Sequence, residues 1–371
     1  MKKIFWIAGE KSGDLHASYV IQKLNKLGNF HNYGVGGSLM ETAGFHSLFE
    51  FSRFNVMGFV EVIKHLGFFL KVEKEIKEIL IKDKPDLVVL VDYPGLNLRI
   101  AKIATQLGIK VLYYICPQFW AWKHKRVFKI KKYTDFVCCI NPFEAPLLDE
   151  YEIPNEYVGH PVAEQIGVKL DKEAFAKEFK LNSKLQWIGL FPGSREMEVE
   201  RHLPIFLQVA QANPEREHLI SIIDKKMLTK LQQTNKAANV KFINGYNYEI
   251  MKYSDFVVAK SGTTTLETTL FATPFVIVYK INPVTVMIAR KIARTEFIGL
   301  PNLIANRLIV KELIQNEVNA ENITNEINQI LNNKASCNSF KAVLEEIKSL
   351  LGDKSASTNT AKRIYEMVGN E

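Results

Sequence analysis

Short apolar runs alternate with amphipathic stretches along the first half of the chain. The runs lie at residues 4–8, 87–91, 111–115 and 136–139. They are rich in Val, Ile and aromatic side chains, which is typical of strands buried on both faces. Between them, residues 17–27 and 72–81 carry apolar side chains at helical spacing. Strands that alternate with helices predict βαβ units and a parallel sheet.

The second half repeats this pattern. Its apolar runs lie at residues 187–191, 219–223, 240–242, 256–259 and 275–279. A polar stretch near residues 168–183 separates the two series. The sequence therefore predicts an α/β protein with two doubly wound domains, residues 1–167 and 168–345. We expect the helical tail, residues 346–371, to pack back on the first domain. Ligands of such sheets bind beyond the carboxyl ends of the strands.

Charge and apolar content restrict the kinds of partner. The net charge of +8 over 371 residues favours nucleotide phosphates, nucleic acid or an anionic membrane. The apolar start of the chain is too short for a signal peptide, and Glu10 and Lys11 interrupt it. No apolar stretch reaches the length of a membrane span. We therefore expect a cytoplasmic protein or one attached to a membrane surface.

Cysteine and histidine spacing gives no indication of a metal centre. The four cysteines show no Cys-x-x-Cys spacing, and the eight histidines are scattered along the chain. We therefore predict no structural disulfide, no metal site and no cofactor.

A candidate phosphate-binding loop follows the run at residues 187–191. The chain continues with Pro-Gly-Ser194-Arg195, and charged residues then open a helix. Ser194 is a plausible N-cap, and free N–H groups at a helix start attract anions. Arg195 adds a planar cationic fork suited to a diphosphate. The alternative is an ordinary turn before a surface helix.

A similar loop follows residues 256–259. Ser261, Gly262, Thr263 and Thr264 offer hydroxyl and N–H groups suited to phosphate. Glu267 could accept hydrogen bonds from both ribose hydroxyls of a nucleotide. The alternative is a Thr-rich helix start, with an acidic residue that the helix dipole favours.

In the first domain, two strand ends carry candidate chemistry. Small and polar residues after residue 8 allow a tight turn, although the pattern matches neither a P-loop nor G-x-G-x-x-G. These loop residues are Gly9, Glu10, Ser12, Gly13 and Asp14. Asp92 follows the run at residues 87–91. It could act as a general base if it reaches a substrate hydroxyl, or it could be a helix cap or turn former.

Two further segments suggest contact with acylated or anionic partners. Residues 117–132 mix aromatics with cations, including Trp122, Lys125 and Arg126. They would suit a nucleic-acid strip, a pocket for a phosphorylated sugar beside a lipid, or a solvated basic helix face. Residues 55–70 would suit either a helix in the membrane interface or a buried helix. Their large apolar side chains cover more than one helix face, so we expect some to be exposed; they include Met57, Phe59, Val60, Ile63, Phe68 and Phe69.

Several motifs, in this order, resemble those of the lipid-A-disaccharide synthases, inverting glycosyltransferases of the GT-B class. The resemblance covers nearly the whole chain. It rests on residues 9–14, 56–58, 92–97, 120–122, 125–130, 158–161, 192–195, 261–263, 300–302 and 311–315.

The resemblance implies two Rossmann-like domains that face each other across a cleft. It implies UDP-2,3-diacylglucosamine as donor and 2,3-diacylglucosamine 1-phosphate (lipid X) as acceptor, with no metal. Asp92 matches the family's essential carboxylate and Arg195 its essential arginine. Asn302 and Gln315 join the loops above as UDP-binding candidates. Gly95 stands where the family often has a second acidic residue. This difference argues against a mechanism that requires two carboxylates in this loop.

The resemblance also implies where the protein works. The first domain would face the acceptor and the membrane, the second would bind the UDP-sugar, and the protein would associate peripherally with the inner leaflet of the inner membrane. We expect no nucleic-acid partner, and a homodimer is left open. Two rival hypotheses remain: a UDP-sugar 2-epimerase or another GT-B enzyme acting on UDP-sugars, and a non-enzymatic nucleic-acid binder.

Overall fold

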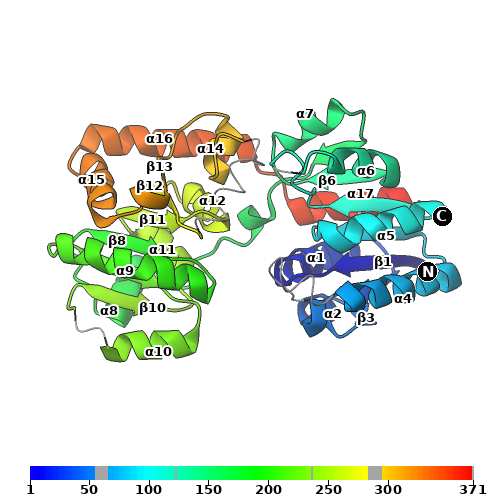
Figure 1. The fold of residues 1–371 in the computed structure, drawn as a ribbon, viewed down its shortest axis with the longest axis horizontal. Coiled ribbons are helices and arrows are strands. Elements are labelled where there is room, and N and C mark those ends of the chain that lie inside the picture. Colours follow the sequence, from blue (N-terminus) through cyan, green and yellow to red (C-terminus); the bar gives the residue numbers. More distant parts are fainter. Residues whose placement is uncertain (55–65, 122, 235–236, 283–294, 370–371) are drawn as a thin grey trace. The chain divides into compact units, whose positions relative to one another are not determined.

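The computed structural model describes residues 1–54, 66–121, 123–234, 237–282 and 295–369. They form two compact units, each with its own sheet and helices (Figure 1). Unit 1 contains Met1–Glu164 and Asp353–Glu371, and unit 2 contains Gln165–Gly352. The sequence placed the boundaries after residues 167 and 345, whereas the chain passes between the units after Glu164 and Gly352.

Unit 1 is built on a parallel sheet of seven strands, in the order β3-β2-β1-β4-β5-β6-β7. The strands are β1 (Lys2–Ala8), β2 (Phe30–Val35), β3 (Phe45–Ser47), β4 (Leu87–Val91), β5 (Lys110–Tyr114), β6 (Phe136–Cys139) and β7 (Asn155–Tyr157). The four predicted strands are confirmed as β1, β4, β5 and β6. They are next to one another in the sheet, and because both of their faces are buried, they read as continuous apolar runs.

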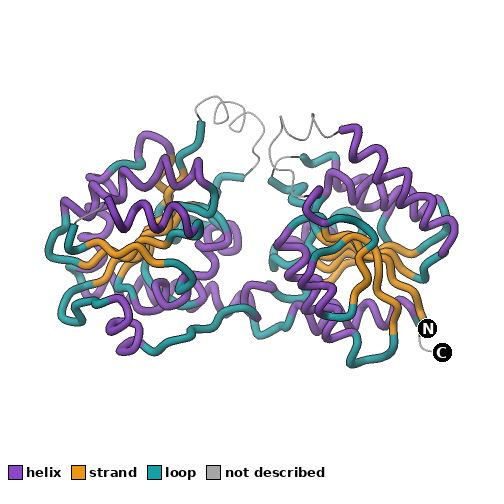
Figure 2. The backbone as a smooth tube through the Cα atoms, turned by 90° about the horizontal axis from the view of Figure 1, so that it is seen from below, coloured by secondary structure: helices purple, strands orange, loops and turns teal. Residues whose placement is uncertain are grey.

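Helices cover both faces of this sheet (Figure 2). They are α1 (Lys11–Leu24), α2 (Ser38–Thr42), α4 (Leu66–Asp83), α5 (Pro94–Gln106), α6 (Arg126–Tyr133), α7 (Glu144–Asp149) and α17 (Ala356–Val368), with the 3-10 turns η1 (Phe51–Phe54) and η2 (Pro161–Glu164). One core contains residues of α4, α5 and α6, and the other contains residues of α1 and α17. Alternate residues of β1 enter the two cores, as the period of a strand requires.

Unit 2 is built on a parallel sheet of six strands, in the order β10-β9-β8-β11-β12-β13. The strands are β8 (Trp187–Phe191), β9 (Glu217–Ser221), β10 (Val240–Ile243), β11 (Phe256–Lys260), β12 (Phe275–Tyr279) and β13 (Glu312–Ile314). Around them lie α8 (Lys172–Phe179), α9 (Glu196–Ala212), α10 (Lys225–Thr234), α11 (Asn247–Tyr253), α12 (Thr263–Leu270), α14 (Leu300–Ala305), η3 (Gln315–Glu317), α15 (Ala320–Leu331) and α16 (Lys334–Leu351). The two sheets confirm the predicted fold class of two doubly wound, Rossmann-like domains.

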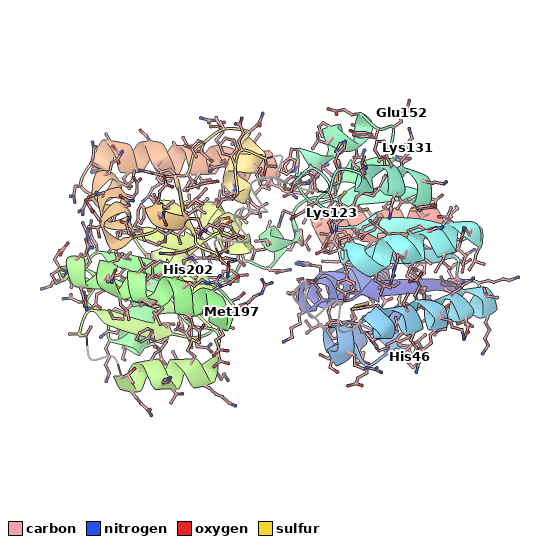
Figure 3. All side chains as sticks on the ribbon, in the orientation of Figure 1. His46, Lys123, Lys131, Glu152, Met197 and His202 are labelled. Carbon is pink, nitrogen blue, oxygen red and sulfur yellow. The ribbon has the colours of Figure 1, made fainter. Side chains whose placement is uncertain are left out.

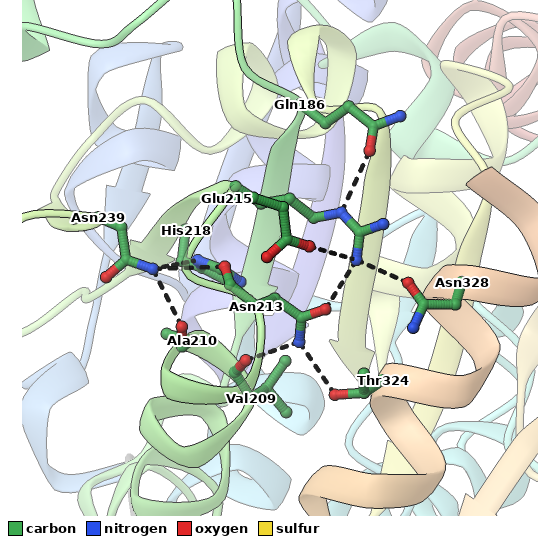
Figure 4. A network of polar contacts seen from close by, with 10 residues as sticks. Gln186, Val209, Ala210, Asn213, Glu215, His218, Asn239, Thr324 and Asn328 are labelled. Atoms are coloured by element: carbon green, nitrogen blue, oxygen red, sulfur yellow. Dashed lines mark hydrogen bonds and ion pairs between the residues drawn. The ribbon is translucent and has the colours of Figure 1, made fainter. Parts of the chain in front are cut away.

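A buried arginine connects the helices at the amino end of β9 (Figure 4). The Arg216 guanidinium donates to the side-chain oxygens of Gln186 (3.1 Å), Asn213 (2.7 Å) and Asn328 (2.8 Å). Asn213 in turn donates to Thr324 Oγ1 at 3.0 Å. These bonds tie the end of α9 to α15, on the side of the sheet opposite the carboxyl ends of the strands.

Candidate functional site

Asp92 lies in a sharp turn directly after β4. Asp92 and Tyr93 both have φ of 46°, in the left-handed region that non-glycine residues rarely adopt. The Asp92 carbonyl accepts hydrogen bonds from the Tyr113 hydroxyl at 2.6 Å and from Asn97 Nδ2 at 2.7 Å. These contacts from β5 and α5 hold a backbone conformation that the sequence alone disfavours.

The loop after β1 packs closely against this turn. A Cβ atom on Gly9 would lie 2.6 Å from Cδ1 of the Tyr93 ring, so only glycine fits there. The Tyr93 hydroxyl donates to the Phe54 carbonyl at 3.2 Å. Because β1 and β4 are paired, with Ala8 opposite Val91, the loops that follow them leave the sheet side by side.

The surroundings of Asp92 make it a stronger base than an ordinary aspartate. Burial, assisted by the negative charge of Glu10, raises the pKa of Asp92 to about 6, although the positive charge of Arg126 opposes this rise. A carboxyl group with this pKa is mostly ionised at neutral pH and can still take a proton. Glu10 therefore supplies a second carboxylate near Asp92, from the end of β1 and not from the start of α5, where Gly95 lies.

Among the other predicted residues of this N-terminal segment, Asp14 stabilises the fold. The buried Asp14 carboxylate accepts N–H groups from Gly37 (2.9 Å), Leu39 (3.3 Å) and Met40 (3.1 Å), at the start of α2. It therefore caps α2. Gly13 is buried, whereas Ser12 is exposed near the start of α1.

The aromatic and cationic block is anchored by a buried acid. The Glu144 carboxylate accepts Trp120 Nε1 at 3.1 Å and Asn141 Nδ2 at 2.9 Å. Lys125 is exposed, and Arg126 begins α6. Trp122 lies outside the described residues. Lys131 pairs with Glu152 on the surface at 2.8 Å (Figure 3), so part of this block is a solvated helix face.

The predicted membrane segment is only partly described. Met57, Phe59, Val60 and Ile63 lie outside the described residues. Phe69 is not among the exposed side chains of this segment, and Phe68 is partly buried. Phe69 is 7% exposed and belongs to the core under α4, and Phe68 packs on Phe54 with ring centroids 5.5 Å apart. Among the described residues, no helix combines the length and apolar character needed to cross a membrane.

In unit 2, a carboxylate from the first turn of α9 accepts hydrogen bonds from the loop after β8. Arg195, not Ser194, is the N-cap of α9. Glu198 folds back, and its Oε2 accepts the N–H of Ser194 at 3.0 Å and that of Arg195 at 3.4 Å. Glu198 was missed from the sequence. Its signal was an acidic residue three positions after the N-cap, the spacing of a capping box.

Glu198 also connects this loop to the loop after β11. Lys260 Nζ lies 2.8 Å from Glu198 Oε1, and Arg195 Nη1 lies 3.7 Å from the same oxygen. Burial would raise the pKa of Glu198, but the hydrogen bond and charge of Lys260, with the N–H groups, hold it below its ordinary value. Lys260 was also missed, because only the pairing of β8 with β11 brings it beside Arg195.

The start of α12 leaves its first N–H groups without a side-chain cap. Gly262 is the N-cap and has no side chain to accept these N–H groups, while its carbonyl accepts the Thr265 hydroxyl at 2.7 Å. Ser261 Oγ donates to the Ile298 carbonyl at 3.0 Å, while Thr263 is exposed. Glu267 is partly buried and accepts the Tyr248 hydroxyl at 3.4 Å. Burial raises the pKa of Glu267.

Two residues predicted to bind UDP, Asn302 and Gln315, form hydrogen bonds within the protein. The buried Asn302 donates to the Val310 carbonyl and to Glu312, and its oxygen accepts the N–H of Ile309 and Val310, all at 2.8–3.0 Å. Gln315 exchanges two hydrogen bonds with the backbone of Ile281. We therefore assign both side chains to loop support.

Two doubly wound, Rossmann-like units define the GT-B fold class. One similar solved structure is UDP-GlcNAc 2-epimerase from Neisseria meningitidis, with TM-score 0.64 and 13% identity over 98% of this chain and 99% of that one. Another is CalG4, the calicheamicin glycosyltransferase, with TM-score 0.67 and 13% identity over 100% of this chain and 99% of that one. At this identity the likeness shows the fold alone.

Sequence comparison identifies the family. The lipid-A-disaccharide synthetase family matches residues 4–366. The lipid-A-disaccharide synthase of Trichlorobacter lovleyi is 36% identical over 99% of this chain and 98% of the relative. Lipid-A-disaccharide synthase 1 of Legionella pneumophila (strain Philadelphia 1) is 36% identical over 95% of this chain and 94% of the relative. The chain belongs to the lipid-A-disaccharide synthase family.

Proposed function

We propose that this chain transfers a diacylglucosamine unit from UDP-2,3-diacylglucosamine to lipid X. The products are the β-1,6-linked lipid A disaccharide 1-phosphate and UDP. The observation that carries the proposal is the family match over residues 4–366, supported by full-length relatives at 36% identity.

In the proposed mechanism, Asp92 is the general base. The primary hydroxyl of lipid X attacks the anomeric carbon of the donor, and Asp92 takes the hydroxyl proton. The bond to the diphosphate breaks in the same step, so one in-line displacement converts the α-linked donor into a β-linked product. The raised pKa of Asp92, about 6, suits a base that works near neutral pH.

The leaving UDP collects negative charge as the bond breaks. Arg195 and the N–H groups at the start of α12 would stabilise that charge. These groups follow β8 and β11, which are neighbouring strands of one sheet. No metal is part of this mechanism.

Product analysis tests the proposal directly. Purified protein is incubated with both acylated glucosamine substrates, and the disaccharide and UDP are followed by mass spectrometry. Heat-denatured protein and reactions lacking one substrate are the controls. Absence of disaccharide would contradict the proposal. Conversion of a water-soluble UDP-sugar without acceptor would favour an epimerase, and salt-dependent RNA binding without UDP affinity would favour a nucleic-acid binder.

Glu267 is proposed to bind the ribose of UDP. Replacing Glu267 with Ala should weaken UDP affinity by roughly 1.5–3 kcal/mol, the usual worth of hydrogen bonds to a charged group. Isothermal calorimetry with UDP measures the change. Glu321→Ala, at an exposed position of α15, is the matched control. An unchanged dissociation constant would leave Glu267 as part of the helix start only.

We also propose peripheral attachment to the inner leaflet, through α6. Phe128 is 57% exposed, and Lys125 and Lys129 beside it are exposed as well. An exposed aromatic ring among cations is suited to an anionic lipid surface.

Replacing Phe128 with Ser should therefore reduce binding to vesicles containing anionic phospholipid by about tenfold or more, because burying a large apolar side chain gains roughly 1.5–3 kcal/mol. Vesicle flotation measures this binding. Ile81→Ser, at a residue 48% exposed near the end of α4, is the control. Equal vesicle binding by both variants would remove α6 from the membrane contact.

A further inference from the structure

The Glu198 carboxylate lies between two cations that come from neighbouring strand ends. Lys260 is the last residue of β11, and the register pairs Ala259 with Phe191 at the end of β8. Lys260 therefore leaves the sheet beside the loop formed by residues 192–195. Its ammonium is 2.8 Å from Glu198 Oε1, whereas the Arg195 guanidinium is 3.7 Å from that oxygen.

Glu198 is fixed in place by its own loop. Its other oxygen accepts the N–H groups of Ser194 and Arg195. A Cβ atom on Gly193, where φ is +123°, would lie 2.5 Å from Glu198 Oε2 and 2.6 Å from its Cβ, so the backbone packs directly on this side chain. The Glu198 carboxylate is therefore held in one position. The two cations compete for its remaining oxygen, Oε1.

Lys260 holds the shorter contact in this competition. Its side chain is 19% exposed and lies 5.7 Å from the centroid of the Tyr279 ring, whereas the side chain of Arg195 is 59% exposed. The partly buried lysine is thus committed to Glu198, whereas the arginine side chain is mostly exposed to solvent.

We propose that Lys260 is a positioning residue for Arg195. By occupying Oε1 of Glu198, it keeps the Arg195 guanidinium free to meet the donor diphosphate. This inference rests on the proposed function, and it adds Lys260 as the residue that keeps the Arg195 guanidinium available to the diphosphate. Without Lys260, Oε1 of Glu198 would lose its closest cation, and the nearby guanidinium would pair with it. A guanidinium engaged by a carboxylate has fewer donors for a leaving diphosphate.

A double-mutant cycle tests the proposal. Lys260→Met should lower kcat for disaccharide formation by about 10–100-fold, the range expected when a charge-assisted hydrogen bond is lost. UDP affinity should change less than kcat, because the main loss is in the transition state. Adding Glu198→Gln to Lys260→Met should restore most of kcat, since no anion remains to capture Arg195. Lys260→Arg should retain activity, because it keeps the positive charge at Glu198.

Chemical accessibility of Arg195 provides a readout that does not depend on turnover. Phenylglyoxal modifies free guanidinium groups, and peptide mass spectrometry measures modification at Arg195. Lys260→Met should slow this modification, and adding Glu198→Gln should restore its rate. Lys252→Met is the control, at an exposed position near the end of α11. Thermal unfolding of every variant reports whether the fold is intact.

The outcomes separate the alternatives. Equal losses of kcat and UDP affinity in Lys260→Met, with no rescue by Glu198→Gln, would mean that Lys260 binds the phosphate itself and would overturn the proposal. A lower Tm with unchanged kcat and unchanged Arg195 modification would mean a structural role only and would also overturn it. If the wild-type protein forms no disaccharide, the proposed function fails, and Arg195 modification still decides whether Lys260 controls this arginine.

Discussion

Replacing Asp92 with Asn is expected to lower turnover by about 10²–10⁴-fold, the usual effect of removing a general base. Asn keeps the size of the side chain and cannot accept a proton. The turn at Asp92 is held through its carbonyl, which Tyr113 and Asn97 bind, so the fold should survive. Steady-state kinetics with both acylated substrates measure the loss, and calorimetry should show unchanged UDP binding.

The pH dependence of the wild-type enzyme provides a second measurement of the same residue. Asp92 must be ionised to accept a proton, and its pKa is about 6. The value of kcat/KM should therefore fall as the pH is lowered through about 6. Glu10→Gln removes a negative charge that raises this pKa, so its profile should move to lower pH. Near-normal turnover of Asp92→Asn would exclude Asp92 as the base.

Replacing Arg195 with Ala is expected to lower kcat by about 10²–10³-fold, as for other groups that stabilise developing charge. Ground-state binding of the donor should weaken less, because the contact with the diphosphate strengthens as UDP departs. Rapid-quench kinetics and UDP calorimetry separate the two effects. Arg201→Ala, further along α9, is the control.

Arg195→Lys distinguishes charge from shape. Lysine carries the charge without the planar fork, so it should restore only part of the activity. Full activity in Arg195→Lys would show that a point charge suffices. A parallel loss of kcat and donor affinity in Arg195→Ala would instead place the contact in the ground state.

The central strands were predictable because strands that are buried on both faces consist of continuous apolar runs. The runs at residues 187–191 and 275–279 coincide with β8 and β12. The edge strand β10 was predicted from the run at residues 240–242, whereas β2, β3, β7 and β13, which lie at or next to a sheet edge, were not. β3, β7 and β13 have three residues each, and β2 contains His31 and Asn32. Strands so short or so polar give no apolar run to detect.

The loops of the candidate site were predictable from their positions after strands, but their internal contacts were not. Glu198 meets Lys260 only through the pairing of β8 with β11, which links residues far apart in the sequence. Asn302 was assigned to UDP by resemblance, and only the structure shows its amide bound to the backbone around Val310. Phe69 needed the same three-dimensional context, because a buried and a lipid-facing phenylalanine look alike in sequence.

The discontinuity of unit 1 sets an order of assembly on the ribosome. Unit 2 is one continuous segment and can complete its core during synthesis. Unit 1 is translated first, yet its second core includes Ala356, Ala361 and Ile364 of α17, which emerge only after all of unit 2. The nascent first unit therefore exposes the apolar surface of α1 until α17 has been synthesised, and this surface is where a chaperone would have most to protect.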